Sequence, residues 1–160
     1  MADVTPTFAT DSKAVLKPQV TTSAGGEEAA RRSGRRRTKH SKVIGDRAEA
    51  IVHASLQKDG LNGLRWLANE GEKPGWDIEY IGKDGRLVAV EVKGTTGSAF
   101  TSFEMTDGKW QQAQQLRERY VLYLVSRCAS KEPLITKIID PFGRGDFEIV
   151  PVLRRIVARR

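Results

Sequence analysis

The spacing of apolar and polar positions predicts helices and strands from about residue 43 onward. Apolar residues recur at helical intervals from Ile44 to Leu56, and a second helix is predicted at 106–120, with Thr106 or Asp107 as its N-cap. Alternating or continuous apolar runs predict strands at 64–68, 76–82, 86–93, 120–126 and 134–140, and a short further one at 102–106. The order helix, three strands, helix, two strands favours an α/β architecture, a mixed sheet flanked by helices.

The strand predicted at 86–93 ends on two charged residues. Because side chains alternate between the faces of a strand, Glu91 and Lys93 share one face with Leu87 and Ala89, about 6.6 Å apart along the chain. Glycine follows at position 94, so we expect the strand to end there and both charges to reach a cleft rather than the core. An exposed ion pair across neighbouring strands is the alternative interpretation.

A carboxylate from the preceding strand is expected to join Glu91. Alternation places Trp76 with Ile78 and Tyr80 on one face and Asp77 on the other. The Asp-Gly turn at 83–86 predicts antiparallel pairing of the two strands, which brings Asp77 towards Glu91.

These two carboxylates suit a hard divalent cation, and the backbone carbonyl of Val92 could add a ligand. Glu49 lies at the edge of the apolar stripe of the first helix, where it could reach the same site. A position on the solvated surface is the alternative for Asp77 and for Glu49.

Helix Glu49, then "GWDI" with Asp77, then "VEVKG" with Glu91 and Lys93, resembles the PD-(D/E)XK nuclease superfamily, whose fold is restriction endonuclease-like. More narrowly, the segments "GDRAEAIVHASL", "GWDIEY", "VAVEVKGT" and "SFEMTDGKWQQAQQLRERYVLYLV" are similar to the family named for the C-terminal domain of the plant protein NO VEIN. The resemblance covers about residues 44–140. The usual Pro-Asp of the superfamily is Trp76-Asp77 here. Domains of this family are usually attached to a helicase or ATPase module, which implies such a partner.

The resemblance implies a metal-dependent endonuclease. Asp77 and Glu91 would hold Mg²⁺ or Mn²⁺, with Glu49 bound directly or through a water, and Lys93 would stabilise negative charge beside the attacking water. The implied catalytic residues are therefore Glu49, Asp77, Glu91 and Lys93. One glutamine of the second helix would orient the substrate, from among Gln111, Gln112, Gln114 and Gln115, and a solvated helix face is the alternative for these four residues. Phosphate contacts from the loop after the strand are expected from Thr95 and Thr96.

The charge of the chain is concentrated at its two ends. The 160 residues carry a net charge of +7, yet residues 44–153 contain 14 basic and 16 acidic side chains. Basic ends favour a polyanion, and we expect DNA rather than RNA as the partner. The nucleic-acid contacts are expected from Arg31, Arg32, Arg35, Arg36, Arg37 and Lys39. A solubilising tail, or a nuclear import signal at 31–42, is the alternative for this cluster.

Composition also divides the chain and suggests its compartment. Residues 1–42 are expected to be a disordered basic tail, 43–153 the nuclease domain and 154–160 a second basic tail. The single cysteine, Cys128, excludes an intramolecular disulfide, and neither a secretory signal nor a membrane span is visible in the sequence. An intracellular protein is expected, either cytoplasmic or, in a eukaryote, nuclear.

Three hypotheses for the function remain open. The first is a metal-dependent nuclease, for which cutting both strands of a duplex would favour a homodimer. The second is a catalytically silent module of the same fold that binds nucleic acid or a protein. The third is a role of the basic segment 150–160 at a membrane surface or with a partner.

Overall fold

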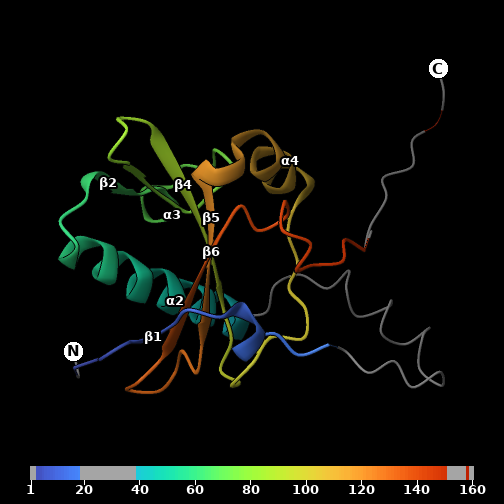
Figure 1. Cartoon of the computed structure of the whole chain (residues 1–160). Helices are drawn as coiled ribbons and strands as arrows, with labels where there is room; N and C mark the ends of the chain where they lie inside the picture. The colour runs from blue at the N-terminus through green and yellow to red at the C-terminus, as the bar shows by residue number, and fades with distance from the viewer. Residues whose placement is uncertain (1–2, 19–38, 151–157, 159–160) are drawn as a thin grey trace.

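Six strands form a mixed sheet, and helices cover its two faces (Figure 1). The structure is a computed structural model that describes residues 3–18, 39–150 and 158. The strands are β1 (Thr7–Ala9), β2 (Asn62–Trp66), β3 (Ile78–Ile81), β4 (Leu87–Gly94), β5 (Tyr120–Ser126) and β6 (Leu134–Ile139). The helices are α2 (Lys39–Lys58), α3 (Leu67–Glu70) and α4 (Asp107–Leu116), with short 3₁₀ turns η1 (Ser12–Ala14) and η2 (Arg117–Arg119).

The strand order is β1-β6-β5-β4-β3-β2. Strands β2, β3 and β4 pair antiparallel in chain order, whereas β4 and β5 are parallel and are connected through α4. β6 then pairs antiparallel with β5. The parallel pair at the centre requires a crossover, and α4 supplies it. This mixed sheet with flanking helices is the α/β architecture that the sequence predicts, and it agrees with a restriction endonuclease-like fold.

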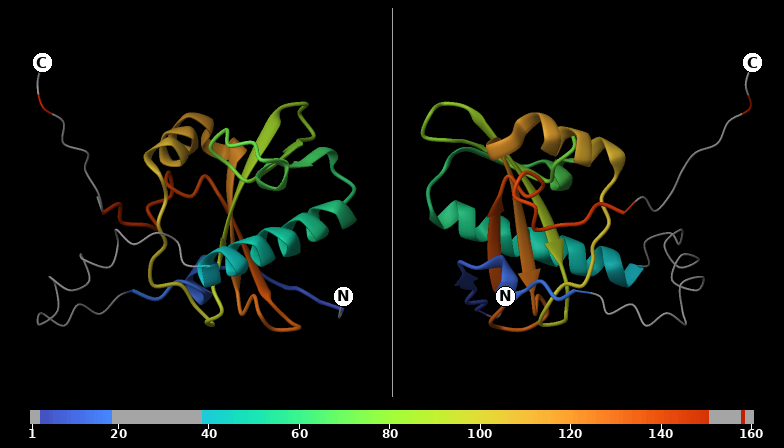
Figure 2. Two further views of the ribbon diagram at one scale, coloured as in Figure 1. Left: turned by 180° about the vertical axis from the view of Figure 1, so that it is seen from behind. Right: turned by 45° about the vertical axis from the view of Figure 1, so that its right-hand side comes forward.

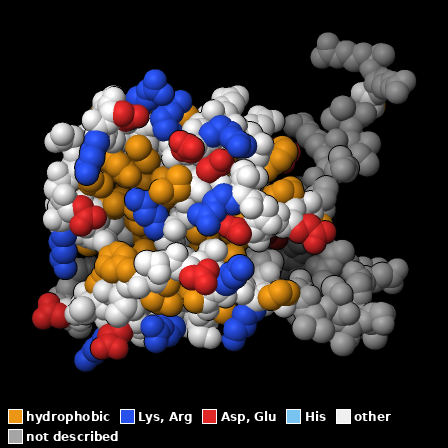
Figure 3. Space-filling model, in the orientation of Figure 1, with side chains coloured by type: hydrophobic (Ala, Val, Ile, Leu, Met, Phe, Trp, Pro, Cys, Tyr) orange, Lys and Arg blue, Asp and Glu red, His pale blue; other side chains and the backbone are white. Residues whose placement is uncertain are grey.

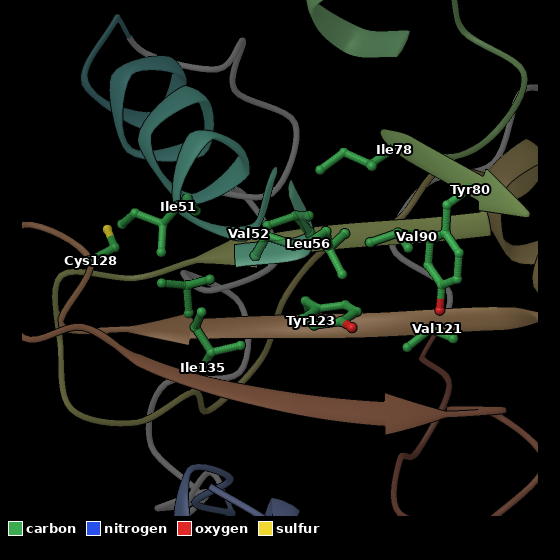
Figure 4. Close-up of a cluster of buried hydrophobic side chains, with 13 residues drawn as sticks. Ile51, Val52, Leu56, Ile78, Tyr80, Val90, Val121, Tyr123, Cys128 and Ile135 are labelled. Carbon is green, nitrogen blue, oxygen red and sulfur yellow. The ribbon is translucent and has the colours of Figure 1, made fainter. Parts of the chain in front are cut away.

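One face of the sheet packs against α2. The buried helix residues Ala48, Ile51, Val52 and Leu56 recur at helical spacing and contact the strand residues that point to the same side (Figure 4). The strand side of this core includes Ile78, Tyr80, Val90, Val92, Val121, Tyr123 and Val125. In the part of the chain that is described, no helix combines the length and the apolar character needed to cross a membrane.

Helix α4 lies on the opposite face, near the end of the sheet where β5 begins (Figure 2). Its buried residue Ala113 packs with Ala89 of β4 and Tyr120 of β5. Since Ala89 alternates with Val88 and Val90, which face α2, the odd-numbered residues of β4 face α4. Leu87 and Ala89 therefore share one face of β4, as predicted. Glu91 and Lys93 lie on the same face, because they continue the same alternation along the strand.

Several predicted elements differ from the structure. The strand 120–126 is found as predicted, but α2 begins at Lys39 rather than near residue 43. Residues 102–106 form no strand. Trp76 precedes β3 and packs on the α4 side, with its indole N–H donating to Glu79 at 2.9 Å. The prediction that Trp76 shares a face with Ile78 is therefore wrong, because strand alternation starts only at Ile78.

The N-terminal segment 3–18 is part of the fold. Strand β1 pairs parallel with β6, and Val15 is completely buried beside Phe100. The prediction of a disordered tail over residues 1–42 is thus wrong for residues 3–18, since a three-residue edge strand leaves no periodic signal in the sequence. Residues 19–38 and, apart from Ala158, the predicted tail 154–160 lie outside the described residues.

Candidate active site

Asp77 is fixed beside β4 at the point where β3 begins. The register pairs Ile78 with Val90, and the backbone N–H of Asp77 donates to the Val90 carbonyl at 2.9 Å. The carboxylate oxygen Oδ2 of Asp77 then accepts the backbone N–H of Val92, also at 2.9 Å. The Asp77 carboxylate therefore accepts the hydrogen bond of Val92 just before β3 begins, in the way a backbone carbonyl would. The two bonds to β4 hold the Asp77 side chain in one position.

The carbonyl of Val92 projects to the same edge of β4. Within a strand, the N–H and C=O of one residue point to the same side. Since the Val92 N–H is directed at Asp77, the Val92 carbonyl points to the same side of β4, towards the start of β3. The Val92 carbonyl therefore lies on the side of β4 that faces Asp77 and β3.

Glu91 lies on the α4 side of β4 and is completely buried. Its oxygen Oε1 lies 2.9 Å from the ammonium nitrogen of Lys93. The side chain of Lys93 is 11% exposed, so this pair is largely shielded from solvent. The expectation that both charges reach a cleft is wrong for Glu91, which is satisfied inside the protein by ammonium groups instead.

The second ammonium group comes from Lys109, in the first turn of α4. Its Nζ lies 2.7 Å from Oδ1 of Asp77, and 2.9 Å and 2.7 Å from Oε1 and Oε2 of Glu91. Asp77 and Glu91 are therefore brought together as predicted, and one cation binds both.

Lys109 is the residue that sequence reasoning missed. Lys109 is the third residue of an Asp-x-Lys sequence at 107–109, which the sequence indicates only as the start of a helix. The structure shows that helix start: the backbone N–H of Lys109 donates to Oγ1 of the N-cap residue Thr106. One signal was present: a lysine in the first turn of a helix opposes the helix dipole, which favours a carboxylate partner elsewhere.

Burial and neighbouring charges together shift the pKa values of this group. Burial raises the pKa of Glu91, while the ammonium groups of Lys93 and Lys109 oppose the shift and favour the ionised carboxylate. Burial alone would lower the pKa of Lys109, but Glu91 and Asp77 outweigh it and the pKa is raised. The hydroxyl of Tyr120 donates to the Gly75 carbonyl at 3.2 Å. Burial is the largest cause that raises the pKa of Tyr120, and the nearby carboxylates raise it further.

Glu49 reaches the neighbourhood of the pair without joining it. It lies on α2, across the sheet from Glu91, and its Oε2 accepts the indole N–H of Trp66 at 2.9 Å. The Trp66 ring in turn stacks on His53, with ring centroids 5.2 Å apart. Burial raises the pKa of Glu49, the Trp66 bond opposes this, and the charge of Asp77 adds to it, so Glu49 is within electrostatic range of the site.

The remaining candidates fall around or outside this centre. Gln112 is half-buried beside Gly75, whereas Gln111, Gln114 and Gln115 are exposed. Thr95 accepts the backbone N–H of Gly97 within its own loop, and Thr96 is exposed. Lys39 is exposed at the start of α2. The other basic candidates, Arg31, Arg32, Arg35, Arg36 and Arg37, lie outside the described residues.

The oxygen atoms of this site can be compared with the needs of a magnesium-sized cation. Mg²⁺ usually binds through one or two carboxylates, keeps several waters and leaves positions for substrate phosphates. Asp77, Glu91 and the Val92 carbonyl are the groups that could hold such an ion, and the Lys109 ammonium occupies the position between the two acids. Over residues 3–18, 39–150 and 158, no three side chains of His, Cys, Asp or Glu gather closely enough to hold a metal. Glu49, the remaining candidate carboxylate, binds Trp66 through Oε2 and does not join the pair.

The surface seen in Figure 3 mixes charges of both signs. Lys and Arg side chains alternate with Asp and Glu side chains across this face. The mixture agrees with the near balance of 14 basic and 16 acidic residues between 44 and 153. Attraction of this face for a polyanion is therefore local rather than spread over a basic surface.

Comparison with known proteins assigns the family. A family model described as "Protein NO VEIN, C-terminal" matches residues 45–138, which include Glu49, Asp77, Glu91, Lys93 and Lys109. No curated protein and no solved structure matches the chain. Because the family model spans more than half of the chain and extends from within α2 into β6, this chain is a member of the NO VEIN C-terminal domain family.

Proposed function

We propose that this domain hydrolyses phosphodiester bonds in nucleic acid, DNA rather than RNA, with Mg²⁺ or Mn²⁺ as cofactor. The observation that carries the proposal is the meeting of Asp77 and Glu91 around one cationic group, with Lys93 beside Glu91. A hydrolase of this kind needs acids that gather a metal ion and a fixed positive charge next to them. The family membership and the fold support the same proposal.

The carboxylates have separate roles in this proposal. Asp77 and Glu91 would hold the metal, and the Val92 carbonyl would be an additional ligand. The bound metal supplies Lewis acidity to the phosphoryl oxygen and lowers the pKa of water. The backbone N–H of Val92, bound to Oδ2 of Asp77, fixes the direction of the remaining oxygen of that carboxylate. Glu49 acts from α2, directly or through an intervening water, while its Oε2 accepts the indole N–H of Trp66.

Lys93 is the catalytic ammonium group of the proposal. It lies on the same strand as Glu91, two residues on, so the rigid sheet sets its distance from the acid pair. A fixed positive charge in a shielded position stabilises the negative charge that develops at phosphorus, and it does so more strongly than in bulk water. We assign that role to Lys93.

The proposed substrate contacts surround the acid pair. Thr95 and Thr96 follow β4 directly and are proposed to bind phosphate, while the cluster from Arg31 to Lys39 is proposed to add affinity without sequence preference. Cleavage of both strands of a duplex requires two sites, so we propose a homodimer on that substrate. A helicase or ATPase module is the partner that family analogy suggests. An intracellular compartment is proposed because the one cysteine, Cys128, is buried as a free thiol.

A silent binding module is the second candidate, and one observation favours it. Every carboxylate oxygen of the pair already has a partner: Asp77 binds Val92 and Lys109, and Glu91 binds two lysines. Such a closed set of ion pairs is what a purely structural polar cluster requires. The fold would then present its basic ends to nucleic acid or to a protein without chemistry.

Cleavage of plasmid DNA by the full chain distinguishes the two candidates. We expect the wild-type protein to nick or linearise the plasmid with Mg²⁺ or Mn²⁺ and to be inactive in EDTA. The Lys93→Ala variant should bind DNA as the wild type does and leave it uncut. Equal binding by both proteins without cleavage, on duplex, single-stranded and branched substrates, would establish the binding module instead.

A further inference from the structure

The position between the two acids is filled by a side chain of the protein itself. The Lys109 ammonium contacts three carboxylate oxygens at 2.7 Å, 2.7 Å and 2.9 Å, which is as many partners as it has protons to donate. These oxygens include Oδ1 of Asp77, the oxygen that is not bound to the Val92 N–H. They are therefore the same carboxylate oxygens that a metal ion at this pair would need.

Lys109 and a divalent cation cannot share this position. Two cations that use the same oxygens would lie within a few ångströms of each other, where their repulsion in a shielded site is strong. The charge balance leads to the same result. Asp77 and Glu91 are neutralised by Lys93 and Lys109, whereas removal of Lys109 leaves one net negative charge for a metal to meet.

The two lysines differ in their freedom to move away. Lys93 is on the central strand β4, and its side chain is 11% exposed. Lys109 approaches from α4, and its side chain is 23% exposed, so its flexible four-carbon stem has a route to solvent. Lys109 can therefore leave without disturbing the sheet.

We infer that Lys109 is a tethered cation that holds Asp77 and Glu91 together in the metal-free protein and is displaced when a divalent metal ion binds. The inference rests on the proposed metal site and adds a competitor to it. The competition weakens metal affinity and couples metal binding to the exposure of one ammonium group at the site.

Manganese titration calorimetry at constant ionic strength tests the competition. The variant Lys109→Met keeps the length of the stem and removes the charge, and Lys131→Met, an exposed lysine before β6, is the matched control. We expect Lys109→Met to bind Mn²⁺ at least about tenfold more tightly than the wild type, and Lys131→Met to match the wild type. Equal or weaker binding by Lys109→Met overturns the inference and leaves the metal site standing. Absence of saturable binding in all three proteins overturns the metal site as well.

Amine labelling tests the displacement of Lys109 in the wild-type protein, without any substitution. A lysine-acylating reagent followed by mass spectrometry reports the accessibility of each ammonium group, with Lys131 as the internal reference. We expect the labelling of Lys109 to rise several-fold on addition of Mn²⁺ while that of Lys131 is unchanged. Equal labelling of Lys109 with and without saturating Mn²⁺ would overturn the displacement.

Discussion

The ammonium nitrogen of Lys109 lies 2.9 Å and 2.7 Å from the two carboxylate oxygens of Glu91, which joins helix α4 to the buried part of strand β4. Glu91 is completely buried, so this contact and the one from Lys93 determine whether a charge can be kept there. A buried carboxylate without partners would cost several kcal/mol, and the lysines therefore stabilise the site as well as shape it.

Removal of the Lys109 charge should destabilise the metal-free protein. In EDTA, we expect Lys109→Met to lower the free energy of unfolding by about 3 kcal/mol, because it leaves Asp77 and Glu91 close together without their shared cation. Urea unfolding followed by circular dichroism measures this value. Lys131→Met should stay within about 0.5 kcal/mol of the wild type. A similar result for both variants would mean that the Lys109 contacts contribute nothing to stability.

Replacement of Lys93 should separate chemistry from metal binding. We expect Lys93→Ala to lower the single-turnover cleavage rate by about 10²- to 10³-fold, since it removes a preorganised positive charge beside the acid pair. Its Mn²⁺ affinity should not fall, because Lys93 is not a ligand. Lys137→Ala, an exposed lysine on β6, is the control and should cut at the wild-type rate. A rate for Lys93→Ala close to that of the control would remove Lys93 from the mechanism.

The close approach of α2 to β4 requires glycine at position 94. A Cβ there would lie 2.6 Å from the Ala48 side chain and 3.2 Å from the Ile44 carbonyl, so we expect Gly94→Ala to push α2 outward and to cost about 2 kcal/mol. Gly45→Ala is the matched control: nothing lies within 4 Å of its Cβ, and alanine in a helix should stabilise by about 0.5–1 kcal/mol. Chemical denaturation of both variants measures the difference, and equal stabilities would contradict this packing.

The N-terminal segment should contribute to stability. Val15 is completely buried, and Val15→Ala should cost about 2 kcal/mol through lost burial and the cavity left behind. Phe8→Thr, on strand β1 with Phe8 62% exposed, should change stability by about 0.5 kcal/mol or less. Thermal or urea unfolding measures both variants. A neutral Val15→Ala would mean that residues 3–18 are not docked in solution.

The thiol of Cys128 should be protected and should make stability fall at alkaline pH. Burial raises the pKa of Cys128 above its ordinary value of 9.0. The protonated thiol is therefore favoured in the fold, and its contribution to stability is lost as the pH rises above 9.0. We expect the stability advantage of the wild type over Cys128→Ala to shrink between pH 8 and pH 10. We also expect alkylation at pH 8 to be far slower in the native protein than in denaturant. A constant advantage with fast native alkylation would contradict this environment.

The sequence predicted the helices and strands in which apolar residues recur at regular intervals. The strand 120–126 and the alternation that puts Glu91 on one face of β4 follow from continuous or alternating apolar residues. The hairpin between β3 and β4 followed from its Asp-Gly turn, and it brought Asp77 towards Glu91 as expected. Local pattern was sufficient in these places because each element repeats its signal over several residues.

The partners of Glu91 could be predicted only in part. Lys93 is two residues away on the same strand, whereas Lys109 reaches Glu91 through a crossover whose packing has no local signal in the sequence. The position of Glu49 depends likewise on Trp66, a residue of another element. Long-range side-chain contacts of this kind are set by tertiary packing, which the spacing of residues along one segment does not encode.

The position of a bound metal tests the central claim most directly. Anomalous diffraction from crystals of the full chain soaked in Mn²⁺ locates the ion without reference to activity. We predict a single strong anomalous peak between the carboxylates of Asp77 and Glu91, with the Lys109 side chain moved away from both. A peak elsewhere, or none at saturating Mn²⁺ with Lys109 still bound to the two acids, would contradict a metal-dependent site in this domain.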